Sequence, residues 1–88
     1  MEQLGKPFGS AIRRRRRELE LSQESLSERS GVHWVYISHI ENGQKSPTLR
    51  VIERLAVALH MKVSALMKVA EQIQAEGDVD CKSKAPGE

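Results

Sequence analysis

The chain of 88 residues, with a net charge of +2, can build only one small core, and aliphatic side chains must form it because only 3% of the residues are aromatic. Its single cysteine, Cys81, excludes an internal disulfide bond and a cysteine-based metal site. No apolar segment is long enough to cross a bilayer or to form the core of a signal peptide, which predicts a cytoplasmic protein with no membrane partner.

The N-terminal part of the chain combines a short flexible segment with a basic helix. Residues 1–7 are predicted to be flexible, and a helix is predicted from Phe8 to Leu19. This helix contains five consecutive arginines, Arg13 to Arg17. Such a run favours a polyanionic partner, although taken alone it is more often a helix face that is merely solvated.

The next segment is predicted to form two short helices joined by a tight corner. Ser22 is expected to cap the first, residues 23–30, through its hydroxyl group. Gly31, which has no Cβ, allows the corner, and Gly43 suits the position after the second helix, residues 33–42. The apolar anchor beneath the pair is expected to consist of Leu26, Val32, Ile37 and Ile40. Such a pair typically lays its second helix into the major groove of DNA.

Two longer helices complete the folded part of the chain. Thr48 is expected to cap a fourth helix, and a fifth is predicted from about Val63 to Ala75. The apolar stripes follow the helical period and comprise Leu49, Ile52, Leu55, Ala56 and Leu59 on the fourth helix and Val63, Leu66, Met67, Ala70 and Ile73 on the fifth. Residues 77–88 show no such period and are predicted to be disordered. No alternating strand pattern is present, so the fold class is all-α, with one folded domain at residues 8–76.

The predicted third helix has two different faces. Because successive residues advance by about 100°, placing Ile37 at the centre of the buried face puts Ile40 and Glu41 beside it and His33 near it. The outward positions are Val35, Ser38 and His39, with Trp34 and Asn42 on the flank. An exposed valine and tryptophan indicate contact with a partner. The alternative is that Trp34 folds back against the second helix or the following loop.

Four segments carry a family resemblance, namely residues 21–26, 31–32, 36–43 and 46–48. Their sequences, Leu-Ser-Gln-Glu-Ser-Leu, Gly-Val, Tyr-Ile-Ser-His-Ile-Glu-Asn-Gly and Ser-Pro-Thr, closely resemble the Cro/C1-type helix-turn-helix family of phage repressors and xenobiotic-response-element-like regulators. The resemblance covers about residues 12–67. It implies a compact five-helix, lambda-repressor-like domain that binds operator DNA, usually as a two-fold symmetric homodimer.

The same resemblance implies an ion pair between Arg16 and Glu41, which stand where this family often joins its first and third helices. A carboxylate on the buried side of the third helix would be costly without a partner. Two positions depart from the family pattern. Glu20 replaces the glycine that commonly ends the first helix, so this turn is expected to be strained or closed differently. Arg15 occupies a position that is often apolar.

The groups on and beside the third helix suit different parts of a DNA duplex. Val35 suits a thymine methyl group, Trp34 suits thymine methyl groups or the sugar edge, and His39 suits a purine N7 or a phosphate. Ser38 is short and adaptable, and the Gln23 amide suits a phosphate at the start of the second helix. The predicted DNA-binding set is completed by His33, Asn42, Gln44, Lys45 and Arg13, of which the last three suit the flanking backbone.

The fifth helix is predicted to mediate dimerisation. Its apolar stripe is longer than a small core needs, so Leu66, Met67, Ala70 and Ile73 are expected to contact a second copy. The alternative is that the whole stripe packs on the first and fourth helices. A two-fold dimer would place its recognition helices about 34 Å apart and predicts a palindromic operator.

Other chemistries are not supported by the residue pattern. His33 and His39 face different sides of one helix and His60 is remote, so no metal site or other cofactor is predicted. Nothing resembles a nucleophile elbow or a paired-carboxylate cleft, so no enzymatic activity is expected. We therefore predict a sequence-specific transcriptional regulator, a repressor or autoregulator, that binds double-stranded DNA. The alternative is an antitoxin or anti-repressor that acts mainly by binding a partner protein.

Overall fold

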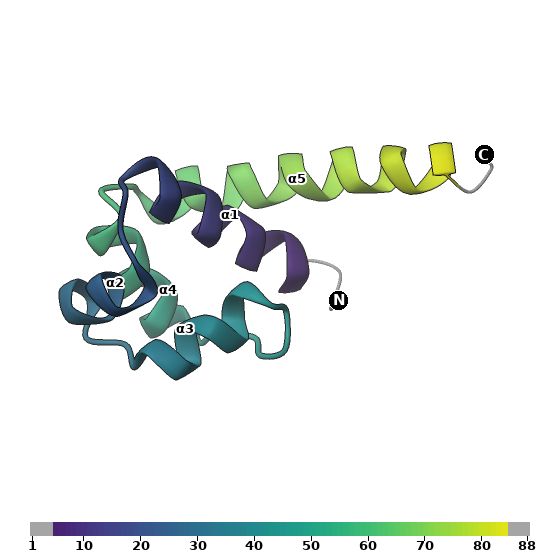
Figure 1. Ribbon diagram of the computed structural model, residues 1–88. Coiled ribbons are helices and arrows are strands. Elements are labelled where there is room, and N and C mark those ends of the chain that lie inside the picture. Colours follow the sequence, from purple (N-terminus) through teal and green to yellow (C-terminus); the bar gives the residue numbers. More distant parts are fainter. Residues whose placement is uncertain (1–4, 85–88) are drawn as a thin grey trace.

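The computed structural model describes residues 5–84, and the side chains of residues 5–76 within this range. This part of the chain forms five helices and no strand: α1 (Gly5–Glu18), α2 (Gln23–Ser30), α3 (Trp34–Glu41), α4 (Leu49–Ala58) and α5 (Val63–Lys84). The predicted all-α fold class and five-helix architecture are confirmed. Figure 1 shows α1 between α5 and α3, with α2 and α4 together at one end of the molecule. The C-terminal part of α5 extends beyond the other four helices.

The core lies where all five helices meet. Its largest fully buried side chains are aliphatic, as the composition predicts: Ile12, Leu26, Ile37, Ile40, Leu55, Leu59 and Leu66. Full burial of one such side chain stabilises the fold by roughly 1.5–3 kcal/mol relative to exposure. The four residues predicted to anchor the α2–α3 pair are all buried. Leu49 departs from the predicted apolar stripe of α4, because this first residue of the helix is 66% exposed.

The ends of the short helices agree with the sequence predictions. The Ser22 hydroxyl accepts a hydrogen bond from a backbone amide of α2 at 2.9 Å, and the Thr48 hydroxyl accepts one from an amide of α4 at 3.3 Å. Gly31 and Gly43, after α2 and α3, have φ of 78° and 77°, a region that glycine adopts readily. These turns set the direction in which α3 leaves α2 and in which the chain leaves α3.

Helix α1 begins earlier than the sequence predicted. It starts at Gly5 instead of Phe8, so Pro7 lies in its first turn. A proline is tolerated there because the first amides of a helix have no helical partner. Residues 1–4 of the segment predicted to be flexible lie outside the described residues.

Helix α5 ends later than the sequence predicted. It continues to Lys84 instead of ending near Ala75. Gly77 costs a helix only about 1 kcal/mol, and the first later proline is Pro86, so no residue between them forces an end. Residues 85–88 of the predicted disordered tail lie outside the described residues.

Two helices end on a residue other than glycine in the left-handed region. Glu20 after α1 has φ of 58°, and His60 after α4 has φ of 59°. In each turn the next amide donates to a carbonyl oxygen five residues earlier, at 2.9 Å in both cases. This conformation costs a residue with a Cβ roughly 1–2 kcal/mol. The strain expected at Glu20 is therefore present.

Helix α1 lies directly on the C-terminal end of α3 at Gly9. A Cβ atom added to Gly9 would meet the carbonyl oxygen of Ile40 and would lie 2.8 Å from that of Glu41. No side chain fits there, so glycine sets the distance between the two helices. The close approach brings Arg13 and Arg16 of α1 next to the last residue of α3.

Candidate nucleic-acid interface

His33 caps the N-terminus of α3 and is not part of the helix. Its Nδ1 accepts a hydrogen bond from the Val35 amide at 3.1 Å, and its ring stacks on the Trp34 indole with centroids 6.0 Å apart. The helical period predicts His33 near the buried face, and this is wrong because His33 is exposed. It precedes the first helical turn, so the geometry of the cap, and not the helical period, determines its direction.

Helix α3 separates a buried face from an exposed one. Ile37 and Ile40 are fully buried on the inner side. Trp34 and Val35 on the outer side are 46% and 37% exposed. The alternative in which Trp34 folds back under cover is therefore not what the structure shows. The remaining outer positions are the half-buried Ser38 and His39 and the exposed Asn42.

Glu41, the last residue of α3, is buried with 3% of its surface exposed. The Arg16 guanidinium of α1 donates from Nε to Oε2 at 2.7 Å and from Nη2 to Oε1 at 3.0 Å, which is a two-pronged ion pair. Burial alone would raise the pKa of the Glu41 carboxyl, but hydrogen bonds from Arg16 and Gln23 and the charge of Arg16 outweigh it and hold the pKa below its ordinary value. The structure thus contains the ion pair that the family resemblance implies.

Two residues predicted to contact phosphate also reach the end of α3. Gln23, the first residue of α2, donates from Nε2 to Oε1 of Glu41 at 3.1 Å. Arg13 of α1 lies 3.4 Å from the same oxygen through Nε and donates from Nη2 to Oδ1 of Asn42 at 3.0 Å. Sequence reasoning missed these contacts, because only the fold brings the three helices together. Both side chains are half-buried. Each therefore braces α3 through its buried part and leaves its remaining surface exposed to solvent next to that helix.

The five arginines of α1 divide into structural and exposed ones. Arg15 donates from Nε to the carbonyl oxygen of Leu59, the C-cap of α4, at 3.0 Å. This contact explains a charged residue where the family often has an apolar one. Arg14 and Arg17 are exposed and make no ion pair within the described part of the chain. The basic run is therefore partly architectural and is not one continuous binding surface.

The loop after α3 continues the exposed surface. The backbone amide of Gln44 donates to the carbonyl oxygen of His39 at 2.8 Å, and this hydrogen bond holds the start of the loop against α3. The side chains of Gln44 and Lys45 are exposed. We call the surface formed by these outward groups the recognition surface; it comprises Trp34, Val35, Ser38, His39, Asn42, Gln44 and Lys45.

Comparison with known proteins identifies the family to which this arrangement of helices belongs. Residues 12–66, more than half of the chain, match the family model HTH_3, which is described as helix-turn-helix. The chain belongs to the Cro/C1-type helix-turn-helix family. It is accordingly a DNA-binding protein that regulates transcription.

Similar helix-turn-helix proteins are regulators. The ImmF control region 10 kDa protein of Bacillus phage phi105 is 30% identical over 76 residues, which cover 86% of this chain and 84% of that protein. The restriction-modification controller protein C.AhdI from Aeromonas hydrophila has a crystal structure with a TM-score of 0.68 and 36% identity, covering 69% of this chain and 92% of that one. The clp gene regulator ClgR from Corynebacterium glutamicum has a TM-score of 0.80 over 97% of this chain and 96% of that one, but at 22% identity it shows a shared fold alone. The chain spans about half or less of several longer relatives. It is a regulator of the controller or repressor type.

The helix-turn-helix domain buries part of the stripe that was predicted to mediate dimerisation. Leu66 and Ala70 are fully buried in the chain's own core, so they offer no surface to a second copy, in contrast to the prediction. The reason is that α5 packs along α1. The alternative interpretation of the sequence expected such packing on the first and fourth helices for the whole stripe. Met67 and Ile73 are half-buried and remain candidates for such a contact.

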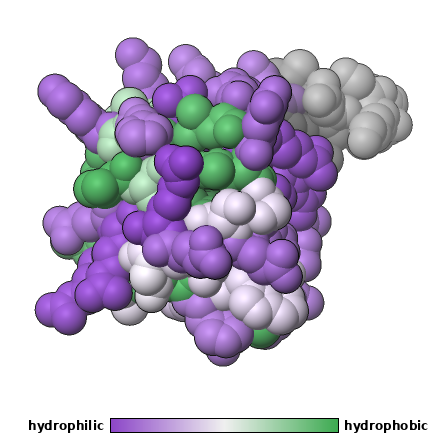
Figure 2. Space-filling view, turned by 60° about the vertical axis from the view of Figure 1, so that its left-hand side comes forward, coloured by the Kyte–Doolittle hydropathy of each residue, from purple (hydrophilic) through white to green (hydrophobic). Residues whose placement is uncertain are grey.

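Helix α4 exposes apolar side chains that sequence reasoning did not single out. Leu49 is 66% exposed and Val57 is 75% exposed. Figure 2 shows apolar surface framed by hydrophilic residues on one face of the molecule. Val57 lies off the predicted apolar stripe of α4, and this position in the helical period could have indicated its exposure. Leu49 lies on the stripe, so the sequence does not distinguish it from the buried residues there. Both side chains are on the helix that carries the predicted stripe, so α4 offers apolar surface to solvent at two separate positions.

Neither a metal-binding cluster nor a membrane-spanning helix is found among the described residues. In this part of the chain, no three His, Cys, Asp or Glu side chains lie close enough to hold a metal ion. The three histidines lie apart, at the cap of α3, in the body of α3 and in the turn after α4. None of the helices seen in residues 5–84 combines the length and apolar character that crossing a membrane needs.

Proposed function

We propose that this chain is a sequence-specific repressor or autoregulator that binds a palindromic operator as a homodimer, with α3 in the major groove of double-stranded DNA. One observation carries the proposal: the inner side of α3 is firmly packed, while Trp34 and Val35 stay exposed at its N-terminal end. Exposed apolar surface on a rigid helix suits contact with thymine methyl groups in the major groove. The names of two similar proteins, a control-region protein and a controller protein, support the same role.

The outward groups of α3 divide the contacts with DNA between them. Val35 and Trp34 face thymine methyl groups, and Ser38 and His39 reach base edges or a phosphate on the next turn. His33 stacks on the indole of Trp34 and so restricts the directions that this large side chain can take. The role of His33 is therefore to orient Trp34 at the entrance to the groove.

The flanking residues supply contacts with the backbone. Gln44 and Lys45 are exposed on the loop after α3, where they can reach phosphates. Gln23 and Arg13 hold Glu41, and the accessible part of each half-buried side chain is available for a phosphate beside α3. These contacts give affinity without sequence information, so binding falls steeply with salt concentration.

A palindromic operator requires two copies related by a two-fold axis. The apolar side chains that are partly or largely exposed include Met67 and Ile73 on α5 and Leu49 and Val57 on α4, which are available to join the copies. A dimer that holds the two α3 helices about 34 Å apart would reach successive major grooves on one side of the duplex.

Selection of bound duplexes from a random library, with the full chain, tests this proposal. We expect an enriched site with two inverted half-sites about 10 base pairs apart, centre to centre. Fluorescence anisotropy then compares the selected site with a random duplex at several salt concentrations. Equal affinity for the two duplexes would contradict sequence-specific binding, and an enriched site without inverted repeats would contradict the symmetric dimer.

The exposed pair Leu49 and Val57 also suits a role as an antitoxin or anti-repressor that binds another protein through α4. Failure to bind DNA, together with co-purification with the product of a neighbouring gene, would favour this role over the regulator. Either role is expected in the cytoplasm, where the DNA and the gene products are found.

A further inference from the structure

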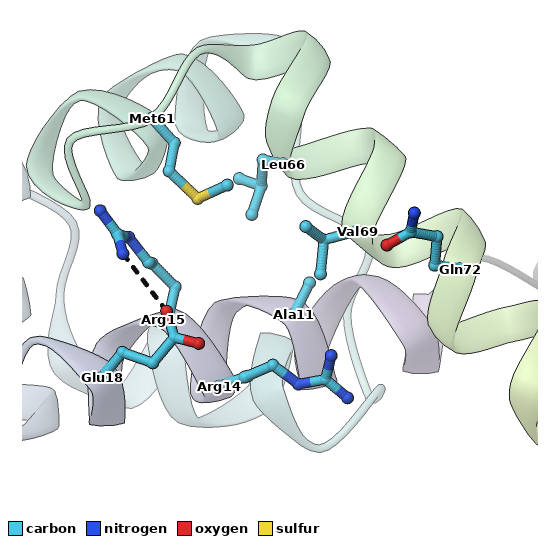
Figure 3. A pocket seen from close by; sticks show the side chains of 8 residues that line it. All are labelled: Ala11, Arg14, Arg15, Glu18, Met61, Leu66, Val69 and Gln72. Carbon is cyan, nitrogen blue, oxygen red and sulfur yellow. Dashed lines mark hydrogen bonds and ion pairs between the residues drawn. The ribbon is translucent and has the colours of Figure 1, made fainter.

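A small pocket lies between α1 and α5, beside the side chain of Met61 (Figure 3). Its volume is about 160 Å³. The accessible apolar part of its wall consists of Met61, from the connection before α5, and Val69 of α5, while Ala11 of α1 and Leu66 of α5 lie buried directly behind them. The pocket is open to solvent on one side and its wall is partly polar, and its volume is comparable to the roughly 150 Å³ of an enclosed cavity that holds one benzene molecule. The pocket therefore suits a hydrocarbon group of one ring or a short branched chain.

The polar part of the wall carries one positive charge without a partner. Arg15 is already engaged, because its Nη1 lies 3.2 Å from Oε1 of Glu18 and its Nε donates to the carbonyl oxygen of Leu59. Glu18 is neutralised by the same ion pair. Arg14 is exposed and makes no ion pair or hydrogen bond among the described residues. Figure 3 shows its side chain extending along α1 past Ala11, at the edge of the pocket.

We propose that this pocket binds a small monocarboxylate, that is, one carboxylate attached to a ring or to a branched hydrocarbon of similar size. The hydrocarbon fills the apolar part, and the carboxylate pairs with the Arg14 guanidinium, which can donate two parallel hydrogen bonds. Gln72 of α5, also in the wall, offers an amide donor. A second negative charge on the ligand would find no unpaired cation in this wall, because Arg15 is already engaged, so the site favours one carboxylate over two.

The pocket is separate from the recognition surface. The side of α1 that faces α5 carries Ala11 and Arg15, whereas the side that faces α3 carries Gly9 and Arg16. A ligand can therefore enter whether or not DNA is bound. The inference goes beyond the proposed function and does not depend on it.

A titration of the full chain with sodium benzoate, followed by the NMR shifts of backbone amides, tests the proposal. Benzyl alcohol is the neutral probe with the same ring. Benzoate is expected to shift the amides of Ala11, Leu66 and Val69 saturably and to bind about tenfold more tightly than benzyl alcohol, because the ion pair adds to the same apolar contact. Equal affinity for the two probes, or no saturable shift at these residues, would overturn the proposal.

Arg14→Gln is the decisive variant, and Arg17→Gln is its matched control, because Arg17 is also an exposed arginine of α1 but does not line this pocket. Arg14→Gln should weaken benzoate binding about tenfold and leave benzyl alcohol binding unchanged, whereas Arg17→Gln should change neither. An equal loss in both variants would show that benzoate only follows the general positive charge of α1, which is incompatible with the proposed site.

A second variant tests the apolar part of the pocket without changing its charge. Val69→Phe fills the space, so it should abolish binding of both probes, and a thermal melt checks that the variant is folded. Benzoate binding that persists in a folded Val69→Phe protein would place the ligand elsewhere and overturn the proposal. If the variant does not fold, the comparison of Arg14→Gln with Arg17→Gln still decides.

Discussion

Gln23 and Glu41, which are 18 residues apart in the sequence, are joined by a hydrogen bond of 3.1 Å from Nε2 to Oε1. The same carboxylate receives two hydrogen bonds from Arg16, so α1 and α2 both hold the last residue of α3. The recognition surface lies on the other side of α3. Besides the packing of Ile37 and Ile40, one buried charge therefore helps to fix its position relative to the rest of the domain.

Glu41→Ala is expected to destabilise the domain by about 3 kcal/mol, because it leaves the Arg16 guanidinium, whose side chain is only 12% exposed, without its counter-charge. Glu41→Gln should cost less, since the amide oxygen still accepts from one donor. Unfolding in denaturant measures both values. If Glu41→Ala is as stable as the wild type, the ion pair does not have the structural role that its geometry indicates.

The stability of the domain is expected to fall in acid as Glu41 takes up a proton. The pKa of Glu41 is lowered in the folded state from its ordinary value of 4.5, so the unfolded chain binds this proton more readily. The resulting stabilisation is fully present above the unfolded pKa and is lost as the pH falls through the lower, folded pKa.

Other carboxylates titrate in the same range, so the informative quantity is the difference in unfolding free energy between the wild type and Glu41→Gln. This difference should be constant near pH 7 and should shrink once the pH falls below about 4.5. A difference that does not change with pH would mean that the charge on Glu41 contributes nothing to stability.

Most helix ends were predictable because their signals act over a few residues. The cap at Ser22 and the left-handed glycines at Gly31 and Gly43 mark their turns without reference to the rest of the fold. The ends of α1 and α5 were not predictable in this way. Pro7 and Gly77 are each tolerated in a helix at modest cost, so the pattern alone does not decide whether the helix includes them.

The candidate site was predictable only in part, for a related reason. The helical period places Trp34 and Val35 outward, and both are exposed. The contacts of Arg13 and Arg15 depend on how α1 crosses α3 and α4, which no local pattern encodes. The burial of Leu66 likewise depends on how α5 packs against α1.

Glu20→Gly is expected to stabilise the domain by about 0.5–1 kcal/mol. Glutamate in the left-handed region costs roughly 1–2 kcal/mol, and glycine avoids that cost at a smaller loss in unfolded-state entropy. Denaturant unfolding measures the change. Glu53→Gly is the control, because Glu53 is exposed inside α4, where glycine should destabilise by about 1 kcal/mol. A loss of stability in both variants would show that the turn after α1 is not strained.

Val35→Ala is expected to weaken binding to the operator by about 1 kcal/mol, or roughly fivefold, while leaving the affinity for random duplex unchanged. The variant loses apolar contact with a base edge and keeps every phosphate contact. His39→Ala should act in the same direction. Fluorescence anisotropy with the selected operator and a random duplex measures these effects.

An operator in which deoxyuridine replaces thymine tests the assigned contact directly, because it lacks only the methyl group. The wild type should bind this operator less tightly than the thymine form, whereas Val35→Ala should bind the two forms alike. A variant that still distinguishes them fully would assign the methyl contact to another residue.

Gly9→Ala is expected to destabilise the domain by at least about 2 kcal/mol, because the added Cβ would meet the carbonyl oxygens of Ile40 and Glu41. These are backbone atoms of a helix and cannot rotate aside, so α1 would have to move away from α3. Gly5→Ala is the matched control in the same helix. Its Cβ would meet nothing within 4 Å, so it should be neutral or slightly stabilising.

Thermal unfolding of both variants measures these stabilities, and anisotropy with the selected operator measures the consequence for function. Even where it remains folded, Gly9→Ala should bind the operator less tightly, because a displaced α1 no longer holds Glu41 and the recognition surface in place. Equal stability of the two alanine variants would mean that α1 does not press on the backbone of α3. The position of α3 would then depend on its buried Ile37 and Ile40 and on the side-chain contacts of Glu41.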